Sequence, residues 1–326
     1  MLNNKNGVLT ISLDFELQYG IEDHNDDYKH AYKENIYGAR TAVLELLNIF
    51  SAYKIHATWG IVGMLLAENK KEIRNYVEYA KSQCKCSLPI EKYLDDIGEN
   101  EEGDKCHYAL SLAKKIMCVK GQEVASHTFS HYYCSQKDSN INAFRGDLLA
   151  AKKIMEEKLN IIPKTILFPR NQVEASFLNA AKEVGFSTYR GLLSIYPYNK
   201  TYNNLCIRAM RLIDSYTGIL GEKAVRCFNN NGMGNVPASS FLRPYSIRFS
   251  SFEKMKKEII KKDMEKAAKM GMIYHLWWHP HNFGKNMEQN IENLREILEF
   301  YRYLSEKYKM VSMNIGEVSS GYSGGE

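Results

Sequence analysis

The chain has little that would place it in a membrane or outside the cell. Its 326 residues contain no apolar run near the ~20 residues that cross a bilayer. The first residues, MLNNKNGVLTISLDF, show no basic region followed by a long apolar stretch, so we expect no secretory signal. There are seven cysteines, an odd number, which favours reduced thiols and a cytoplasmic location. Cys84 and Cys86 are spaced too closely for a typical structural zinc site with Cys106 and His107.

Strong charge of one sign is also missing. The net charge is only +5, and the densest basic run, Lys254–Lys269, carries acidic residues at helical spacing. We interpret that run as the solvated face of a helix, and we expect no nucleic-acid partner. The chain is 44% hydrophobic and 25% charged, as in ordinary globular proteins. Its oligomeric state cannot be predicted from these features.

Short β-branched runs alternate with amphipathic segments along the chain, which predicts a parallel sheet with helical crossovers. The predicted strands are Val8–Asp14, His56–Gly63, Pro163–Pro169, Phe186–Arg190, Phe241–Ile247, Met272–Trp278 and Met310–Asn314. The predicted helices are Ala39–Ala52, Glu68–Lys81, Tyr108–Val119, Ile141–Leu159, Ala175–Val184, Leu205–Leu220, Phe252–Met270 and Glu288–Lys307. Tyr19–Tyr37 and Asn229–Pro237 are predicted to be loops.

Seven or eight such strand–helix units suggest a closed α/β barrel. Because no repeat or low-complexity segment interrupts them, we expect a single domain over residues 1–318. A polar insertion is expected at 82–107 and a flexible tail at 319–326.

The stretch GQEVASHTFSH, residues 121–131, holds two histidines four residues apart. On a helical turn capped by Ser126, His127 and His131 would share a face and hold one metal ion from one side. Asp14 and Glu16 follow the first predicted strand, and carboxylates are expensive to bury without a cation. All these residues, with Arg170 and His279, lie just past strand ends, which in a barrel form one face.

This set of side chains suits a metal-dependent hydrolase that acts on an amide or ester. Three protein ligands leave a coordination position for water, whose pKa zinc lowers to about 7. A second carboxylate can take the proton from that water, and an arginine beside it can keep it ionised. A separate protonated histidine can stabilise the oxyanion and protonate the leaving amine.

The order of these motifs resembles the polysaccharide deacetylases of carbohydrate esterase family four. The similar segments are Ile11–Glu16, Ala57–Gly63, Ser126–His131, Phe168–Arg170 and Trp278–Pro280. The resemblance runs from Val8 to about Val318 and implies an irregular (β/α)7 barrel.

By this resemblance, Asp14 is the general base, Arg170 orients it, and His279 is the general acid. Glu16, His127 and His131 are the ligands of a divalent metal, zinc in first place, with cobalt, nickel or manganese as alternatives. The family has two adjacent aspartates where this chain has Asp14 and Glu16, so either carboxylate could bind the metal.

Further residues near these motifs are candidates for contact with a sugar. Trp278, His281 and Asn171 are expected at the substrate, and Trp277 could also stack on a sugar face. His281 is also a rival of His279 for the general acid. The family's fourth motif has no clear match, and Asp214 is the nearest acid.

The first hypothesis is therefore a cytoplasmic deacetylase of an N-acetylated sugar or oligosaccharide, such as a lipid-linked precursor in surface polysaccharide biosynthesis. A second is hydrolysis of another C–N bond, as in a deformylase or a cyclic amidase. A third is a non-catalytic carbohydrate-binding barrel that has lost its metal.

Overall fold

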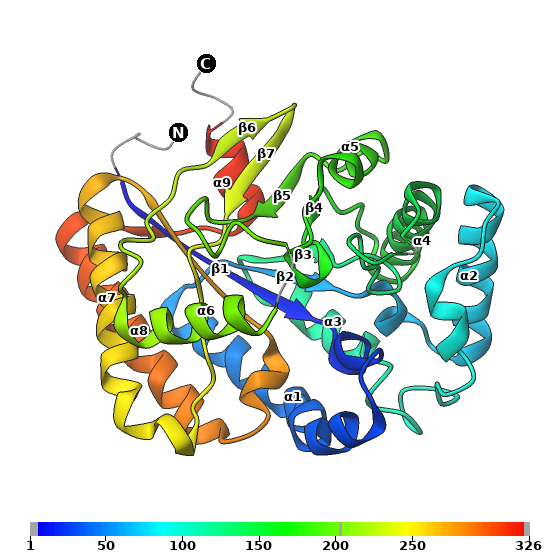
Figure 1. The fold of residues 1–326 in the computed structure, drawn as a ribbon, viewed down its shortest axis with the longest axis horizontal. Coiled ribbons are helices and arrows are strands. Elements are labelled where there is room, and N and C mark those ends of the chain that lie inside the picture. The colour runs from blue at the N-terminus through cyan, green and yellow to red at the C-terminus, as the bar shows by residue number, and fades with distance from the viewer. Residues whose placement is uncertain (1–5, 138, 202–203, 323–326) are drawn as a thin grey trace.

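A ten-stranded curled sheet forms the centre of the molecule, seen in a computed structural model that describes residues 6–137, 139–201 and 204–322 (Figure 1). Its strands are β1 (Val8–Phe15), β2 (Ala57–Ile61), β3 (Gln122–Ser126), β4 (Thr165–Ile166), β5 (Thr188–Gly191), β6 (Phe228–Asn230), β7 (Met233–Pro237), β8 (Ser240–Phe241), β9 (Ile273–Trp278) and β10 (Val311–Ser312). The main path runs β6-β7-β5-β4-β3-β2-β1-β9-β8, with β10 paired to β1. Apart from the antiparallel pair β6–β7, neighbouring strands are parallel.

Nine α-helices are found among the described residues, and they pack around this sheet. They are α1 (Asp26–Tyr53), α2 (Lys70–Cys84), α3 (Leu110–Met117), α4 (Ile141–Leu159), α5 (Ala175–Glu183), α6 (Leu205–Thr217), α7 (Glu253–Met270), α8 (Met287–Tyr308) and α9 (Ile315–Tyr322). Short 3-10 turns join them: η1 (Leu17–Ile21), η2 (Gly63–Leu66), η3 (Pro89–Tyr93), η4 (Pro169–Asn171), η5 (Ile247–Phe252) and η6 (Pro280–Phe283). All eight residues of β1 are buried. The predicted α/β class and barrel of (β/α)7 type are confirmed, as a curled half-barrel.

Several predicted segments differ from the structure. Most of the predicted loop Tyr19–Tyr37 lies in η1 and in α1, which begins at Asp26 because the Asn25 side chain caps it by accepting a hydrogen bond from the backbone N–H of Tyr28. The predicted loop Asn229–Pro237 is the hairpin β6–β7. Residues 319–322 continue α9, and residues 323–326 of the expected tail lie outside the described residues.

The strand register brings the chemistry-bearing segments to one rim of the sheet. Phe15 pairs with Ile61, which pairs with Ser126, and on the other side Leu13 pairs with Trp278. The chain leaves β1, β3 and β9 in the same direction at neighbouring positions, because parallel strands end at the same edge. The side chains that follow these strands therefore meet. Within the described residues, no helix is both long and apolar enough to cross a membrane.

Candidate active site

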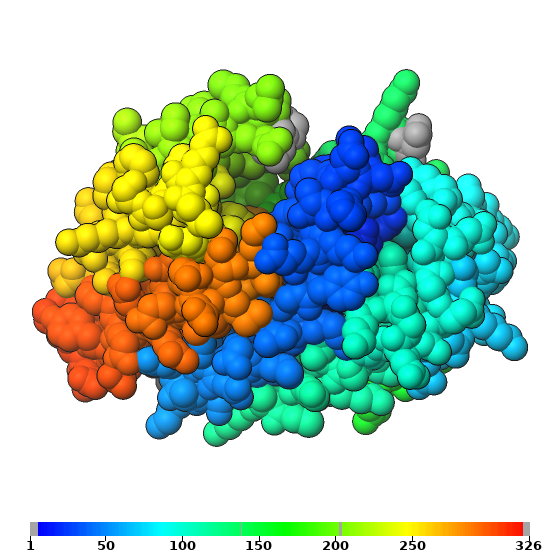
Figure 2. All heavy atoms as spheres, turned by 90° about the horizontal axis from the view of Figure 1, so that it is seen from below, coloured from blue at the N-terminus to red at the C-terminus, as the bar shows by residue number. Residues whose placement is uncertain are grey.

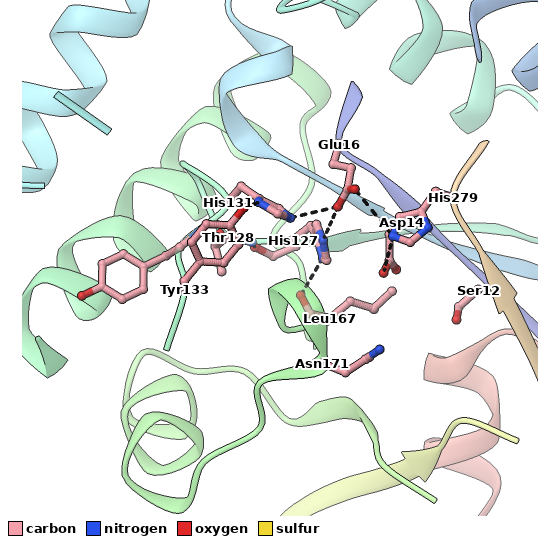
Figure 3. Close-up of polar contacts among 12 residues, drawn as sticks. Ser12, Asp14, Glu16, His127, Thr128, His131, Tyr133, Leu167, Asn171 and His279 are labelled. Carbon is pink, nitrogen blue, oxygen red and sulfur yellow. Dashed lines mark hydrogen bonds and ion pairs between the residues drawn. The ribbon is translucent and has the colours of Figure 1, made fainter. Parts of the chain in front are cut away.

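Three side chains that follow β1 and β3 come together in a buried group (Figure 3). Oε2 of Glu16 lies 3.2 Å from Nε2 of His127 and 2.9 Å from Nε2 of His131. One ligand atom from each of the three residues lies within 4.8 Å of the others. Ligands about 2.1 Å from a tetrahedral zinc ion would be about 3.4 Å apart, so the spacing is close to what such an ion needs.

The hydrogen bonds on the far side of both imidazoles also fit a cation. The Leu167 carbonyl can only accept, so Nδ1 of His127, 2.8 Å away, carries the proton. The Tyr133 hydroxyl donates to Asp23, so its oxygen accepts from Nδ1 of His131 at 3.2 Å. In the neutral rings the lone pairs of both Nε2 atoms then point toward the Glu16 carboxylate. Nε2 of His131 forms no hydrogen bond with any described residue. Metal-binding histidines are oriented by such outer hydrogen bonds.

The pKa values within the group favour an ionised acid beside a neutral imidazole. Burial would raise the pKa of Glu16, but the neighbouring His279 and His131 rings outweigh it and hold this pKa well below its usual range. Burial also lowers the pKa of His131, against the opposing effect of Glu16. A carboxylate and an imidazole with a free lone pair are the ligand forms that zinc requires.

The predicted helical turn that carries the two histidines is wrong. The strand β3 ends at Ser126, and the chain then turns with positive φ at Thr128 (64°) and His131 (57°). No helix begins there, and the Ser126 hydroxyl instead accepts from the backbone N–H of Thr128. Asp147 of α4 holds the loop in place. Its carboxylate accepts hydrogen bonds from the backbone N–H groups of Phe129 (2.6 Å) and Ser130 (3.0 Å) and from the Ser130 hydroxyl.

We expect the variant Asp147→Asn to bind a metal ion about 10- to 100-fold more weakly than the wild type. The amide has only one acceptor oxygen for three donors, so buried N–H groups lose partners and the histidine loop shifts. Metal titration of the apoprotein measures this, with the exposed Asp95→Asn as the matched control. Unchanged affinity in Asp147→Asn would contradict the role of Asp147 in positioning the loop.

The second carboxylate, Asp14, is bound by an arginine that sequence reasoning did not identify. Nη1 and Nη2 of Arg190, on β5, lie 2.7 Å from Oδ1 and Oδ2 of Asp14, and both side chains are buried. Burial would raise the pKa of Asp14, but the guanidinium outweighs it and the pKa is lowered. The Ser12 hydroxyl, 3.1 Å from Nη1 of Arg190 and 2.8 Å from Nε2 of His275, extends this network.

Arg170 does not contact Asp14, contrary to the prediction. Its side chain is partly exposed, pairs with Asp23 at 2.7 Å, and lies over the Tyr133 ring at 4.1 Å. Since Tyr133 accepts from His131, Arg170 and Asp23 surround the outer side of the histidine site instead.

His279, which follows β9, completes the rim. Its Nε2 lies 3.5 Å from Glu16 Oε1 and 3.8 Å from Asp14 Oδ2, and its Nδ1 is 3.1 Å from Asn282 Oδ1. His281 lies behind it, with the two rings stacked at 4.9 Å. Burial, with a smaller contribution from His279, lowers the pKa of His281 to about 3, so His281 stays neutral and only His279 faces the two acids.

Comparison with known proteins gives one family match. Residues 98–189, which include both site histidines, match the family model of the polysaccharide deacetylases. This match supports the predicted resemblance of the chain to the polysaccharide deacetylases. No curated protein sequence matches the chain significantly.

Several solved structures share the fold of this chain. One is a candidate polysaccharide deacetylase from Mycobacterium smegmatis, with a TM-score of 0.61 at 12% identity over 98% of this chain and 91% of that chain. Another is the allantoinase Puue, with a TM-score of 0.60 at 11% identity over 100% and 93%. A third is a GH57-type branching enzyme from the hyperthermophilic archaeon Pyrococcus horikoshii, with a TM-score of 0.54 at 12% identity over 98% and 70%.

Two of the residues expected to contact a sugar are engaged within the protein, Trp278 in the core and Asn171 with Arg190. Trp278 is fully buried and packs its ring against Phe50 and Phe283, so it cannot stack on a sugar. Oδ1 of Asn171 accepts from Nε of Arg190 at 3.0 Å. Trp277, which is partly exposed, lies under the Arg190 guanidinium at 4.5 Å and beside the His279 ring at 5.6 Å. Trp277, and not Trp278, is therefore the tryptophan that lies beside the candidate active-site residues.

Proposed function

We propose that the protein is a metal-dependent hydrolase that removes the N-acetyl group from an amino sugar or oligosaccharide in surface polysaccharide biosynthesis. The observation that carries the proposal is the meeting of three metal-ligand atoms with a second, ionised carboxylate and a histidine on one rim. An amide hydrolase needs this combination of a ligand set, a base and an acid.

Each residue takes the role that its surroundings favour. Glu16, His127 and His131 would hold the divalent ion, which we propose to be zinc, with cobalt, nickel or manganese also compatible with these ligands. When bound, such an ion polarises the amide carbonyl and lowers the pKa of a water molecule. Glu16 is assigned as the carboxylate ligand because its oxygen, and not that of Asp14, contacts both imidazoles.

Asp14 then takes a proton from the attacking water. Arg190 keeps its carboxylate ionised and fixes both oxygens, at the cost of making it a weak base. His279 gives a proton from Nε2 to the leaving sugar amine, while Asn282 accepts from its Nδ1. Water and the amide become acetate and the free amine.

A reducing compartment suits the cysteines, so we place the reaction in the cytoplasm. All seven cysteines have free thiols, including the buried Cys134 and Cys227. Proteins that fold in oxidising compartments more often use such residues in disulfides.

The deciding experiment is acetate release from a set of N-acetylated nucleotide sugars, lipid-linked sugars and oligosaccharides. We expect turnover by the wild type, and a loss of about 10²- to 10⁴-fold in kcat for Asp14→Asn, because the amide cannot accept the water proton. The variant Asp95→Asn, altered at a highly exposed acid, should retain wild-type turnover. Equal rates in Asp14→Asn and wild type would rule out the proposed base.

The same assay separates a second candidate, the opening of a cyclic amide. The fold matches the allantoinase Puue about as well as the candidate deacetylase from Mycobacterium smegmatis, and the same side chains could serve that reaction. Hydrolysis of a cyclic ureide without acetate release from any sugar would favour this alternative. Metal binding without turnover of any substrate would favour a carbohydrate-binding protein.

A further inference from the structure

Large exposed apolar side chains are concentrated in the segment from α6 to the start of α7. Of the exposed large hydrophobic residues in the described part of the chain, half lie between Leu205 and Met255. The most exposed of all are Leu205 (81%), Ile219 (74%) and Ile247 (74%). On α6, Leu205, Ala209 and Ile213 lie four residues apart and are all exposed, so they form one stripe along the helix.

The end of α6 lies against η5 and the start of α7. The Tyr216 ring, near the end of α6, lies 5.5 Å from the Phe249 ring and 6.2 Å from the Phe252 ring, both in η5. The helices α6 and α7 also pack against each other. In Figure 2 the yellow-green segment of α6 and the yellow segment of η5 and α7 adjoin. We name this surface the α6–η5 face, formed by Leu205, Ile213, Ile219, Ile247, Phe252 and Met255.

Positive charge gathers around the same surface. Residues 191–257 contain ten Lys and Arg but three Asp and Glu, whereas the whole chain has a net charge of only +5. Two of the three acids, Asp214 and Glu253, are buried and paired with Lys223 and Lys256. Around the apolar side chains, Arg208, Arg248 and Lys254 are exposed.

We propose that the α6–η5 face docks on an anionic lipid bilayer. Aliphatic and aromatic side chains surrounded by Arg and Lys are the combination that binds at such a surface, through apolar insertion and attraction to acidic headgroups. A second copy of the chain would bring the same positive surface against itself in a two-fold interface, which like charges disfavour. A bilayer supplies both the apolar layer and the opposite charge.

The position of the α6–η5 face also suggests which class of substrate the site acts on. This step rests on the proposed function. Figure 2 shows a recess between the segment around α6 and the dark-blue segment of η1 and the start of α1. Since η1 directly follows the site residue Glu16, a docked protein would present its site beside the lipid surface. The substrate class that fits is an amino sugar carried on a lipid phosphate, with its anchor left in the bilayer.

Sedimentation with vesicles tests the docking without reference to catalysis. We compare vesicles of phosphatidylcholine alone with vesicles containing about one-third phosphatidylglycerol, and expect the wild type to prefer the latter. The triple variant Leu205→Ser/Ile213→Ser/Ile219→Ser should bind at least about tenfold more weakly. Arg208→Glu/Arg248→Glu/Lys254→Glu should lose the preference for phosphatidylglycerol. The control Ile162→Ser/Met270→Ser removes exposed apolar side chains outside the face and should bind like the wild type.

Three results would overturn the docking proposal: no vesicle binding by the wild type, equal binding by the apolar triple variant, or a dimer in solution that this variant abolishes. Acetate release is then measured from bilayer-borne and soluble N-acetyl sugars. We expect the bilayer-borne sugar to be favoured, and the triple variant to reduce that preference. Vesicle binding with no acetate release from any sugar would support docking while overturning the proposed function.

Discussion

The variant His131→Ala is expected to bind no stoichiometric metal and to lose about three orders of magnitude in kcat/KM for acetate release. Only Glu16 and His127 would remain as ligands, and two ligands rarely hold a catalytic ion. A bound ion contributes several kcal/mol to stabilising the transition state, which corresponds to about a thousandfold in rate. Elemental analysis of the purified protein and steady-state kinetics measure the two effects.

The matched control for this variant is His30→Ala, which removes an exposed histidine from α1. It should leave both metal content and turnover at wild-type values. Full turnover in His131→Ala, or in metal-depleted wild type, would contradict the proposed role of the ion. Restored turnover on adding zinc to the depleted wild type, and none on adding zinc to His131→Ala, would tie the loss to this site.

The edge of the sheet that carries the candidate site could be predicted, because buried parallel strands have a clear sequence signature. The run Val8–Asp14 is apolar and β-branched, and the two carboxylates at its end, Asp14 and Glu16, would be unfavourable to bury without a cation. The two histidines lie together with Glu16, as expected, but the predicted helical backbone between them was wrong. A spacing of four residues describes a helical turn and an irregular loop equally well, and the loop depends on Asp147, which is distant in sequence.

Three further differences have local signals in the sequence. Asn231-Gly232, both with positive φ, is the dipeptide most typical of a tight hairpin, and here it joins β6 to β7. Asn25-Asp26-Asp27 is a helix start signal, but the following residues are too polar to show the period of α1. Alternation along β9 gives Trp277, and not Trp278, the parity of His275 and His279.

The arginine that binds Asp14 could not have been predicted from the motif order. Arg170 follows a phenylalanine and a proline at the end of its strand, as the resemblance requires, yet it turns outward to Asp23. Arg190 is 176 residues from Asp14 in sequence, and only the curl of the sheet brings β5 opposite β1. A charged residue in the short, fully buried strand Thr188–Gly191 was the one available sign.

The variant Arg190→Met is expected to lower the free energy of unfolding by about 3–5 kcal/mol, because it leaves the buried Asp14 carboxylate without its partner. Arg170→Met, which breaks a partly exposed ion pair, should cost no more than about 1 kcal/mol. Urea unfolding of the two variants and the wild type measures the difference. Equal losses in the two variants would contradict the assignment of Arg190 as the partner of Asp14.

A double variant, compared with both single variants Arg190→Met and Asp14→Leu, shows whether the loss comes from the ion pair and not from packing alone. In Arg190→Met/Asp14→Leu neither charge is buried unpaired, so this variant should be more stable than Arg190→Met by about 1–3 kcal/mol. The variant Arg190→Lys keeps the charge but cannot contact both carboxylate oxygens as a planar fork. It should therefore be more stable than Arg190→Met while still turning over substrate more slowly than the wild type. If Arg190→Lys had wild-type kcat, Arg190 would be needed only to neutralise Asp14 and not to orient it.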